Sequence, residues 1–136
     1  MKLLSLILLF IFCLLFNNID AQNNITKKNM ELDSIFNYIC ELQIKHPEIV
    51  IKQAIYETGW LKSEFLMSRN NLFGFRAKKY LEFPNWKASV DYYKKWQDKN
   101  YKNEKEDYYS FLVRIKYGTK HYSLHLKKLN YIRYCN

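Results

Sequence analysis

Hydrophobic residues recur at helical spacing along most of the chain, starting close to residue 30. The spacing i, i+3, i+4, i+7 and i+10 is filled by Leu32, Ile35, Phe36, Ile39 and Leu42. Such a stripe gives a helix one apolar face. His46-Pro47 ends this pattern, because the residue before a proline avoids the helical conformation and proline is tolerated in the first turn of the next helix. We therefore expect two successive helices, the second from Pro47 to Gly59.

The second half of the chain contains three more helical stripes. The first begins at Asn85, a residue type that caps helices. A charged segment, residues 97–105, separates the first stripe from the second, and Gly118-Thr119 separates the second from the third. Their predicted inward-facing residues are Val90, Tyr93 and Trp96; Tyr108, Phe111, Leu112 and Ile115; and Tyr122, Leu126, Leu129 and Ile132. The pattern therefore predicts three further helices, with a loop at residues 97–105.

Residues 60–88, between the second and third predicted helices, follow no regular period. Asn70-Asn71 and Gly74 are turn-forming, and residues 80–83 can form a short strand. A chain of 136 residues has room for one modest core. We therefore expect a mainly α fold in which residues 30–136 form a single domain of about five or six helices. A vestigial β-lobe makes its class α+β.

The start of the chain has a different pattern, an almost unbroken apolar run from Leu3 to Phe16. Lys2 precedes the run, and a polar stretch ending in Ala21 follows it, which is the layout of a secretory signal peptide. The run is shorter than the roughly 20 residues that a membrane span needs. We therefore expect a signal peptide over residues 1–21, a flexible lead-in over residues 22–29, and no stable membrane span in the mature protein. The protein is then exported, to the periplasm or to the extracellular cell surface.

Charge and aromatic content narrow the class of partner. The chain has 22 Lys+Arg and 13 Asp+Glu, a net charge of +9, and 18% aromatic residues, too many for a disordered protein. A basic protein binds anionic partners, which are nucleic acid, membrane headgroups or an acidic cell-wall polymer, and export makes nucleic acid the least favoured of the three. Tyr92 and Tyr101 are the tyrosines we expect to be exposed beside the lysines of the third helix. We expect no nucleic-acid partner, and a monomer.

Cysteine and histidine positions suggest a disulfide and argue against a metal site. Cys40 and Cys135 remain after signal cleavage, and an even pair in an exported protein is a candidate disulfide, with two free thiols as the alternative. His121 and His125 are four residues apart, a spacing that metal ligands can have, but no acidic or cysteine third ligand is near them. We therefore expect no metal and no cofactor.

The segment with the strongest chemical signal is Gln53-Ala-Ile-Tyr-Glu-Thr-Gly-Trp60. Glu57 falls at the edge of the buried helix face and near the helix C-terminus, and both positions raise the pKa of a carboxyl group. A carboxylic acid with a raised pKa can protonate a glycosidic oxygen near neutral pH. Trp60 offers a flat face for a sugar ring. By spacing alone, a solvated Glu57 and a core Trp60 are the commoner arrangement.

Three further blocks follow this segment in order, so the four are Gln53–Trp60, Asn71–Phe75, Phe83–Val90 and Tyr117–Tyr122. Together they resemble the glucosaminidase family of bacterial cell-wall hydrolases, glycoside hydrolase family 73, of the flagellar-hydrolase and autolysin type. The family shows Ala-x-x-Glu-[Ser/Thr]-Gly-Trp, Asn-Leu-Phe-Gly, Trp-x-x-Ser-[Ile/Val] and Tyr-Ala-Thr-x-x-x-Tyr. With the residues between and around them, the four blocks of this chain cover about residues 47–130, which is most of the mature chain.

This resemblance implies a lysozyme-like fold and peptidoglycan glycan strands as the substrate. The bond cut is the β-1,4 link between N-acetylglucosamine and N-acetylmuramic acid. Glu57 matches the general acid of the family, and Tyr117 matches its active-site tyrosine. The positions assigned to substrate-binding parts of the motifs are Trp60, Asn71, Phe73, Gly74, Phe75 and Tyr122. Phe75 stands where the family usually has isoleucine, and Tyr122 is one residue closer to Tyr117 than the family pattern has it.

One feature departs from the family pattern. Many members carry a second acidic residue in a small β-lobe between the second and third blocks, and here Glu82 is the only carboxylate in that interval. We expect Glu82 to pair with Lys78 or Lys79 on an exposed strand in preference to acting as a base. The N-acetyl group of the substrate can then serve as the nucleophile. The alternatives are a non-catalytic cell-wall-binding protein on the same fold and a basic membrane-active protein.

Overall fold

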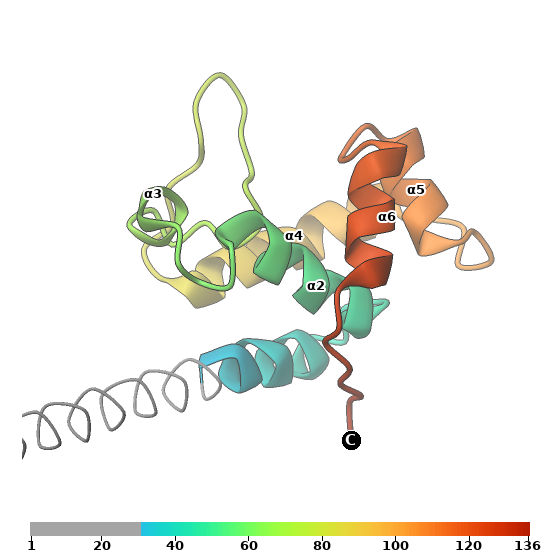
Figure 1. Cartoon of the computed structure of the whole chain (residues 1–136), viewed down its shortest axis with the longest axis horizontal. Helices are drawn as coiled ribbons and strands as arrows, with labels where there is room; N and C mark the ends of the chain where they lie inside the picture. The colour runs from blue at the N-terminus through green and yellow to red at the C-terminus, as the bar shows by residue number, and fades with distance from the viewer. Residues whose placement is uncertain (1–30) are drawn as a thin grey trace, which may run out of the picture. The chain divides into compact units, whose positions relative to one another are not determined.

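The computed structural model describes residues 31–136, and they are mainly helical, as predicted (Figure 1). Residues 31–41 are helical and are followed by five helices, α2 (Pro47–Thr58), α3 (Glu64–Met67), α4 (Trp86–Asn100), α5 (Tyr108–Arg114) and α6 (Lys120–Lys128). Residues 35–136 form one compact unit. The predicted signal peptide over residues 1–21 and the lead-in over residues 22–29 lie outside the described residues.

The helix boundaries follow the capping residues that the sequence supplies. Pro47 opens α2, and Gly59 ends it in the left-handed conformation, with φ 56°. Asn85 caps α4, as predicted, because its side-chain oxygen accepts a hydrogen bond from the Ala88 N–H at 3.0 Å. Thr119 caps α6 in the same way, by accepting from the Tyr122 N–H at 3.2 Å. These local signals fix where the helices that carry the candidate site begin and end.

The predicted loop at residues 97–105 is wrong at its start, because α4 continues to Asn100. Gln97 is buried there, and its amide nitrogen donates to the Lys45 carbonyl and to the Tyr108 hydroxyl, each at 2.8 Å. The expected exposure of Tyr101 is also wrong: only 6% of it is exposed, and its hydroxyl donates to the Glu106 carbonyl at 2.8 Å. Both polar side chains find buried partners that a charge pattern along the chain does not reveal.

The other differences concern the irregular segment and the end of the last helix. Residues 80–83 do not form a strand; within residues 31–136 the only sign of a sheet there is an isolated antiparallel bridge between Arg76 and Tyr80. Helix α6 ends at Lys128, so Leu129 and Ile132 lie outside it, and Ile132 is 67% exposed. The β-lobe that the sequence predicts as vestigial is therefore reduced to an irregular loop with a single bridge.

The core of the compact unit lies among α2, α4, α5 and α6, with α6 packed on both α2 and α5. Its fully buried apolar side chains include Val50, Ile51, Ala54, Ile55, Val90, Tyr93, Phe111, Leu112 and Leu126. Most of these are positions that the helical stripes predict. In the part of the chain that the structure covers, no helix combines the length and the apolar character that crossing a membrane requires.

A disulfide joins Cys40 to Cys135, which are 95 residues apart in the sequence, with 5.7 Å between their Cα atoms. The structure therefore realises the pairing that the sequence offered as a candidate. A cross-link closing so long a loop lowers the entropy of the unfolded chain and stabilises the fold by about 4–5 kcal/mol. It holds the segment that follows α6 against the helical residues that precede α2 (Figure 1).

Candidate active site

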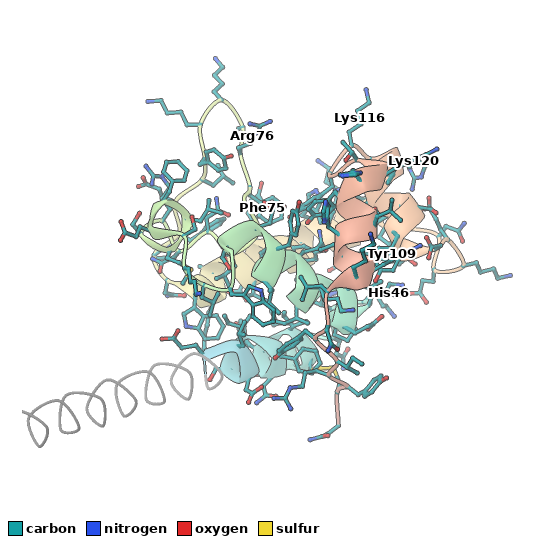
Figure 2. The ribbon with its side chains drawn as sticks, in the orientation of Figure 1. His46, Phe75, Arg76, Tyr109, Lys116 and Lys120 are labelled. Atoms are coloured by element: carbon teal, nitrogen blue, oxygen red, sulfur yellow. A yellow bond between two sulfur atoms is a disulfide. The ribbon has the colours of Figure 1, made fainter. Side chains whose placement is uncertain are left out.

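A cleft of about 510 Å³ lies beside the C-terminal end of α2. It is bounded by the turn after α3, by one face of α4 and by the connection between α5 and α6, and Figure 2 labels Phe75, Arg76 and Lys116 among its residues. The lining residues are Glu57, Phe73, Gly74, Phe75, Arg76, Tyr80, Trp96, Asn100, Ile115, Lys116 and Tyr117. Five of the residues named from the sequence motifs thus meet in one cavity.

Glu57 lies in the last turn of α2 with its carboxyl group at the cleft. Burial raises the pKa of this carboxyl group, in the direction that the sequence predicts. A hydrogen bond from the Tyr122 hydroxyl favours the ionised form and lowers the pKa in part. Because burial is the larger cause, the protonated form of Glu57 persists to higher pH than in an ordinary glutamic acid.

Gly74 allows the backbone of the cleft floor to approach this acid. Its φ of +64° lies in the left-handed region, where a side chain is disfavoured. A Cβ at this position would stand 2.8 Å from Oε2 of Glu57. The glycine of the Asn-Leu-Phe-Gly turn is therefore required twice, for the backbone conformation and for the space that the carboxyl group occupies.

Asn71, which the resemblance places among the substrate-binding residues, is fully buried and bonds to the backbone of its own loop. Its side-chain nitrogen donates to the carbonyls of Phe75, at 2.8 Å, and Leu81, at 3.0 Å. Its side-chain oxygen accepts from the Phe75 N–H at 2.9 Å. Asn71 is therefore a clamp that shapes the loop beneath the cleft, and the contacts that it makes are intramolecular.

Tyr117 lines the wall of the cleft opposite this loop and connects the two sides. Its hydroxyl donates to the carbonyl of Phe73 at 2.7 Å, and its ring lies 5.2 Å from that of Trp96. Burial raises the pKa of Tyr117 well above its usual value, so the hydroxyl stays protonated at physiological pH. The rings of Trp96 and Tyr117 line the cleft, and that of Phe75, which is 9% exposed, packs against both. Aromatic faces are the kind of surface on which sugar rings stack.

A chain of hydrogen bonds runs through the core from Gln97 on α4 to Glu57. The Gln97 amide donates to Tyr108 at 2.8 Å, and the Tyr93 hydroxyl, 2.7 Å from that of Tyr108, donates to the Gln53 oxygen at 2.6 Å. Since the hydrogen of Tyr93 points to Gln53, Tyr108 is the donor between the two tyrosines. The Gln53 nitrogen donates to Tyr122 at 3.4 Å, and Tyr122 in turn donates to the acid.

This network is absent from the expectations based on sequence. The one signal for it is Gln53, a polar residue between the apolar positions Val50 and Ala54, which the structure buries completely. A buried amide needs partners, so its position in the stripe indicates that other polar groups lie inside the core. Tyr122, which the resemblance assigns to substrate binding, is a link in this chain and is not among the residues that line the cleft.

Trp60 and Glu82 do not line the cleft. Trp60 is 38% exposed and meets the ring of Tyr131 edge-on, with 6.3 Å between ring centroids. Glu82 is exposed, and its carboxylate lies 3.6 Å from Nε of Arg69, so the expected pairing with Lys78 or Lys79 is wrong. Among the described residues that line the cleft, Glu57 is the only carboxylate.

Residues that the sequence motifs did not single out also line the cleft, notably Arg76, Asn100 and Lys116. The sequence indicates two of them only through their neighbours, because Arg76 directly follows the motif residue Phe75 and Lys116 directly precedes Tyr117. His121 and His125 lie on the exposed face of α6, with ring centroids 4.9 Å apart. Within residues 31–136, no group of three or more His, Cys, Asp and Glu side chains could hold a metal ion.

Comparison with known proteins gives one match. Residues 36–134 match the Glucosaminidase family, which is described as mannosyl-glycoprotein endo-beta-N-acetylglucosaminidase. No curated protein and no solved structure matches the chain. The matched range contains all four motif blocks and every residue that lines the cleft.

Proposed function

Since the chain belongs to the Glucosaminidase family, we propose that it is an exported peptidoglycan hydrolase acting on the β-1,4 bond between N-acetylglucosamine and N-acetylmuramic acid. The observation that carries this proposal is a carboxyl group with a raised pKa, Glu57, at the floor of a cleft with an aromatic wall. A glycan strand fits such a cleft, because sugar rings stack on aromatic faces while the acid reaches the bond between them.

In the proposed reaction Glu57 is the general acid. Its carboxyl proton passes to the glycosidic oxygen as the bond from that oxygen to the anomeric carbon of N-acetylglucosamine breaks. The raised pKa supports this role, because the group must hold a proton near neutral pH and still release it in the transition state. Gly74 keeps space open at Oε2, the carboxyl oxygen closest to the cleft floor.

The second catalytic group is the 2-acetamido group of the substrate itself. Its carbonyl oxygen attacks the anomeric carbon and forms a cyclic oxazolinium intermediate as the leaving sugar departs. Water then opens the ring, and Glu57, now ionised, accepts the proton of that water. The exposure of Glu82, its ion pair with Arg69 and its position outside the cleft lining support a mechanism in which no second protein carboxylate acts.

Tyr117 is proposed to position the reacting sugar. Because its hydroxyl hydrogen is directed at the Phe73 carbonyl, the hydroxyl oxygen is oriented to accept a hydrogen bond on its other side. Phe75 and Trp96 provide the faces against which neighbouring sugars pack. The disulfide between Cys40 and Cys135 and the net charge of +9 support export to an oxidising compartment with an anionic wall, where the protein acts as a monomer.

The test is the Glu57→Gln variant assayed on purified cell walls. Removing the acid proton while keeping the side-chain volume is expected to lower turnover by about 10²–10⁴-fold. Released muropeptides, reduced and analysed by mass spectrometry, should carry N-acetylglucosamine at the reducing end for the unmodified protein. Glu64→Gln, on the exposed surface of α3, is the matched control and should keep full activity.

Each other product pattern contradicts part of the proposal. A reducing-end muramic acid means lysozyme-type cleavage at the other bond. Absence of product from the unmodified protein, together with wall binding, favours the non-catalytic wall-binding protein. A folded Glu57→Gln variant with unchanged turnover removes Glu57 from the chemistry.

A further inference from the structure

Two cations stand on opposite walls of the cleft, and the proposed chemistry uses neither. Arg76 comes from the loop after the Asn-Leu-Phe-Gly turn, and Lys116 comes from the turn between α5 and α6 (Figure 2). Both side chains are exposed, and no carboxylate within residues 31–136 forms an ion pair with either of them. The cleft is therefore electropositive at its sides, and Glu57 is the one carboxyl group among its lining residues.

The backbone at Lys116 sets this residue apart from an ordinary surface lysine. Helix α5 ends with the Lys116 N–H bonded to the Val113 carbonyl at 3.1 Å and the Tyr117 N–H bonded to the Leu112 carbonyl at 3.0 Å. This is the helix ending at which glycine is the usual residue, because the position is left-handed. Lys116 has φ 58° there. A side chain is thus held at this site despite a local conformational cost. Five other non-glycine residues of the described chain share this conformation, so Lys116 stands out because it combines it with a place in the cleft lining.

The positive charge of the two side chains argues against a role in the bond-breaking step. Positive charge develops on the reacting sugar in glycoside hydrolysis, and a cation beside that sugar would oppose it. The pKa shift of Glu57 comes from burial and from Tyr122, so the cations leave its acid function intact. They are suited to a fixed negative charge on the part of the substrate that lies along the rim.

We propose that Arg76 and Lys116 form a binding subsite for carboxylate groups of peptidoglycan, so that the cleft selects anionic wall glycan over neutral oligomers of N-acetylglucosamine. This inference rests on the proposed function and names the substrate feature that the site recognises. Arginine offers a planar fork for two carboxylate oxygens, and lysine offers a point charge from the other wall. A carboxylate between them gains a partner on each side of the cleft.

Two sources of carboxylate exist in this polymer. Intact walls present the free carboxylates of the stem peptides, while the lactyl carboxyl of muramic acid is engaged in an amide bond. Strands from which an amidase has removed the peptides present the lactyl carboxylate instead. Oligomers of N-acetylglucosamine present none. Using walls stripped of teichoic acid removes phosphate as a competing anion.

The experiment compares Arg76→Gln, Lys116→Gly and the double variant with the unmodified protein. Glycine suits the left-handed position of Lys116, so this variant loses the charge without backbone strain. Turnover on the stripped walls should fall about fivefold for each variant and about twentyfold for both, through a higher KM at similar kcat. The loss should shrink as salt rises, since salt screens exposed charges. Lys78→Gln, on the same loop outside the cleft lining, should change nothing.

Binding provides a second readout that does not depend on turnover. Tryptophan fluorescence reports occupancy, because Trp96 lines the cleft. If the site recognises the lactyl carboxylate, the double variant should bind amidase-treated strands about twentyfold more weakly than the unmodified protein does. If the site recognises the stem-peptide carboxylates, the double variant should show this loss only with fragments that keep the stem peptide. Binding of neutral oligomers should stay within about twofold in both cases.

The outcomes separate this inference from the proposed function. An active unmodified protein whose double variant cleaves walls and binds both anionic substrates normally overturns the carboxylate subsite and leaves the hydrolase intact. An equal loss on neutral oligomers also overturns it, since the variants then damage the cleft in general. A protein that cleaves no wall refutes the proposed function, while the binding comparison still decides the role of the two cations.

Discussion

The two walls of the cleft are stabilised in different ways. The loop wall, residues 71–83, contains no regular strand and is held by Asn71, whose amide bonds to the backbone at Phe75 and Leu81. The helical wall, the turn between α5 and α6 with Tyr117, is held by the rings of Trp96 and Tyr122, the second of which belongs to α6 and lies outside the cleft lining. One wall depends on a few directional polar bonds, and the other depends on close packing.

Each wall is therefore sensitive to a different kind of substitution. A polar truncation in the loop leaves several backbone groups without partners, and each buried group of this kind costs about 1–3 kcal/mol. In the helical wall the loss of a hydroxyl costs less, whereas an added atom has no space to occupy. The variants below are ordered by the size of the expected effect.

Asn71→Ala should have the largest effect, a loss of about 3 kcal/mol in the free energy of unfolding, because three hydrogen bonds to the backbone disappear together. Urea denaturation measures it. Asn70→Gly is the control: it removes a single bond to the Phe83 carbonyl and suits the φ of 50° at that position. If both variants lose the same stability, the loop wall does not depend on Asn71 as a clamp.

Gly118→Ala tests the helical wall by adding volume. A Cβ there would lie 2.3 Å from Cδ1 of Tyr122, so the ring must move, at a cost of about 1–3 kcal/mol. We also expect turnover on cell walls to fall, because the displaced Tyr122 loses its bond to the proposed acid, Glu57. Gly59→Ala separates packing from backbone effects, since nothing lies within 4 Å of its Cβ and only its left-handed φ is unfavourable. Unchanged stability of Gly118→Ala would show that this wall has spare room.

Tyr122→Phe keeps the ring and removes only the hydroxyl, so stability should fall by no more than about 1 kcal/mol. The hydrogen bond from this hydroxyl lowers the pKa of Glu57, and its loss should raise that pKa further. The acid then stays protonated to higher pH, and the alkaline limb of the pH–rate profile should move upward. Tyr56→Phe, whose ring lies 5.1 Å from that of Tyr122, is the control and should leave the profile in place.

The same pKa shift has a consequence for stability. A carboxyl group whose folded pKa lies above its unfolded pKa stabilises the fold fully below the unfolded value, and that contribution is lost as pH rises through the folded value. In Tyr122→Phe the window extends to higher pH, so thermal unfolding of the variant should depend on pH over a wider range than in the unmodified protein. If the alkaline limb of the pH–rate profile or the upper end of this stability window moves to lower pH in the variant, Tyr122 is not a donor to Glu57.

Glu82→Ala should have the smallest effect, about 0.5 kcal/mol or less, because its ion pair with Arg69 is exposed. Turnover on cell walls should be unchanged if the acetamido group of the substrate is the nucleophile. A folded but inactive Glu82→Ala variant would refute that mechanism. It would also mean that the loop wall supplies a catalytic group in addition to shaping the cleft.

Much of the fold follows from local signals. The apolar stripes predict most of the helices and most of the core. Asn85 predicts where α4 begins, and Gly59 predicts where α2 ends. These features depend on neighbours a few residues apart, so the sequence is enough to predict them. The family motifs indicate in addition that Glu57, Gly74 and Tyr117 belong to one site, and in the structure all three line one cleft.

Periodicity and motifs are therefore enough to predict the helices other than α3, the family, the candidate acid and the direction of its pKa shift. Tertiary structure alone decided which groups surround that acid. It directed Tyr122 to Glu57, removed Glu82 from the cleft and placed Arg76 and Lys116 on opposite walls. These are contacts between residues far apart in the chain, and burial and charge at such contacts exist only once the helices have packed.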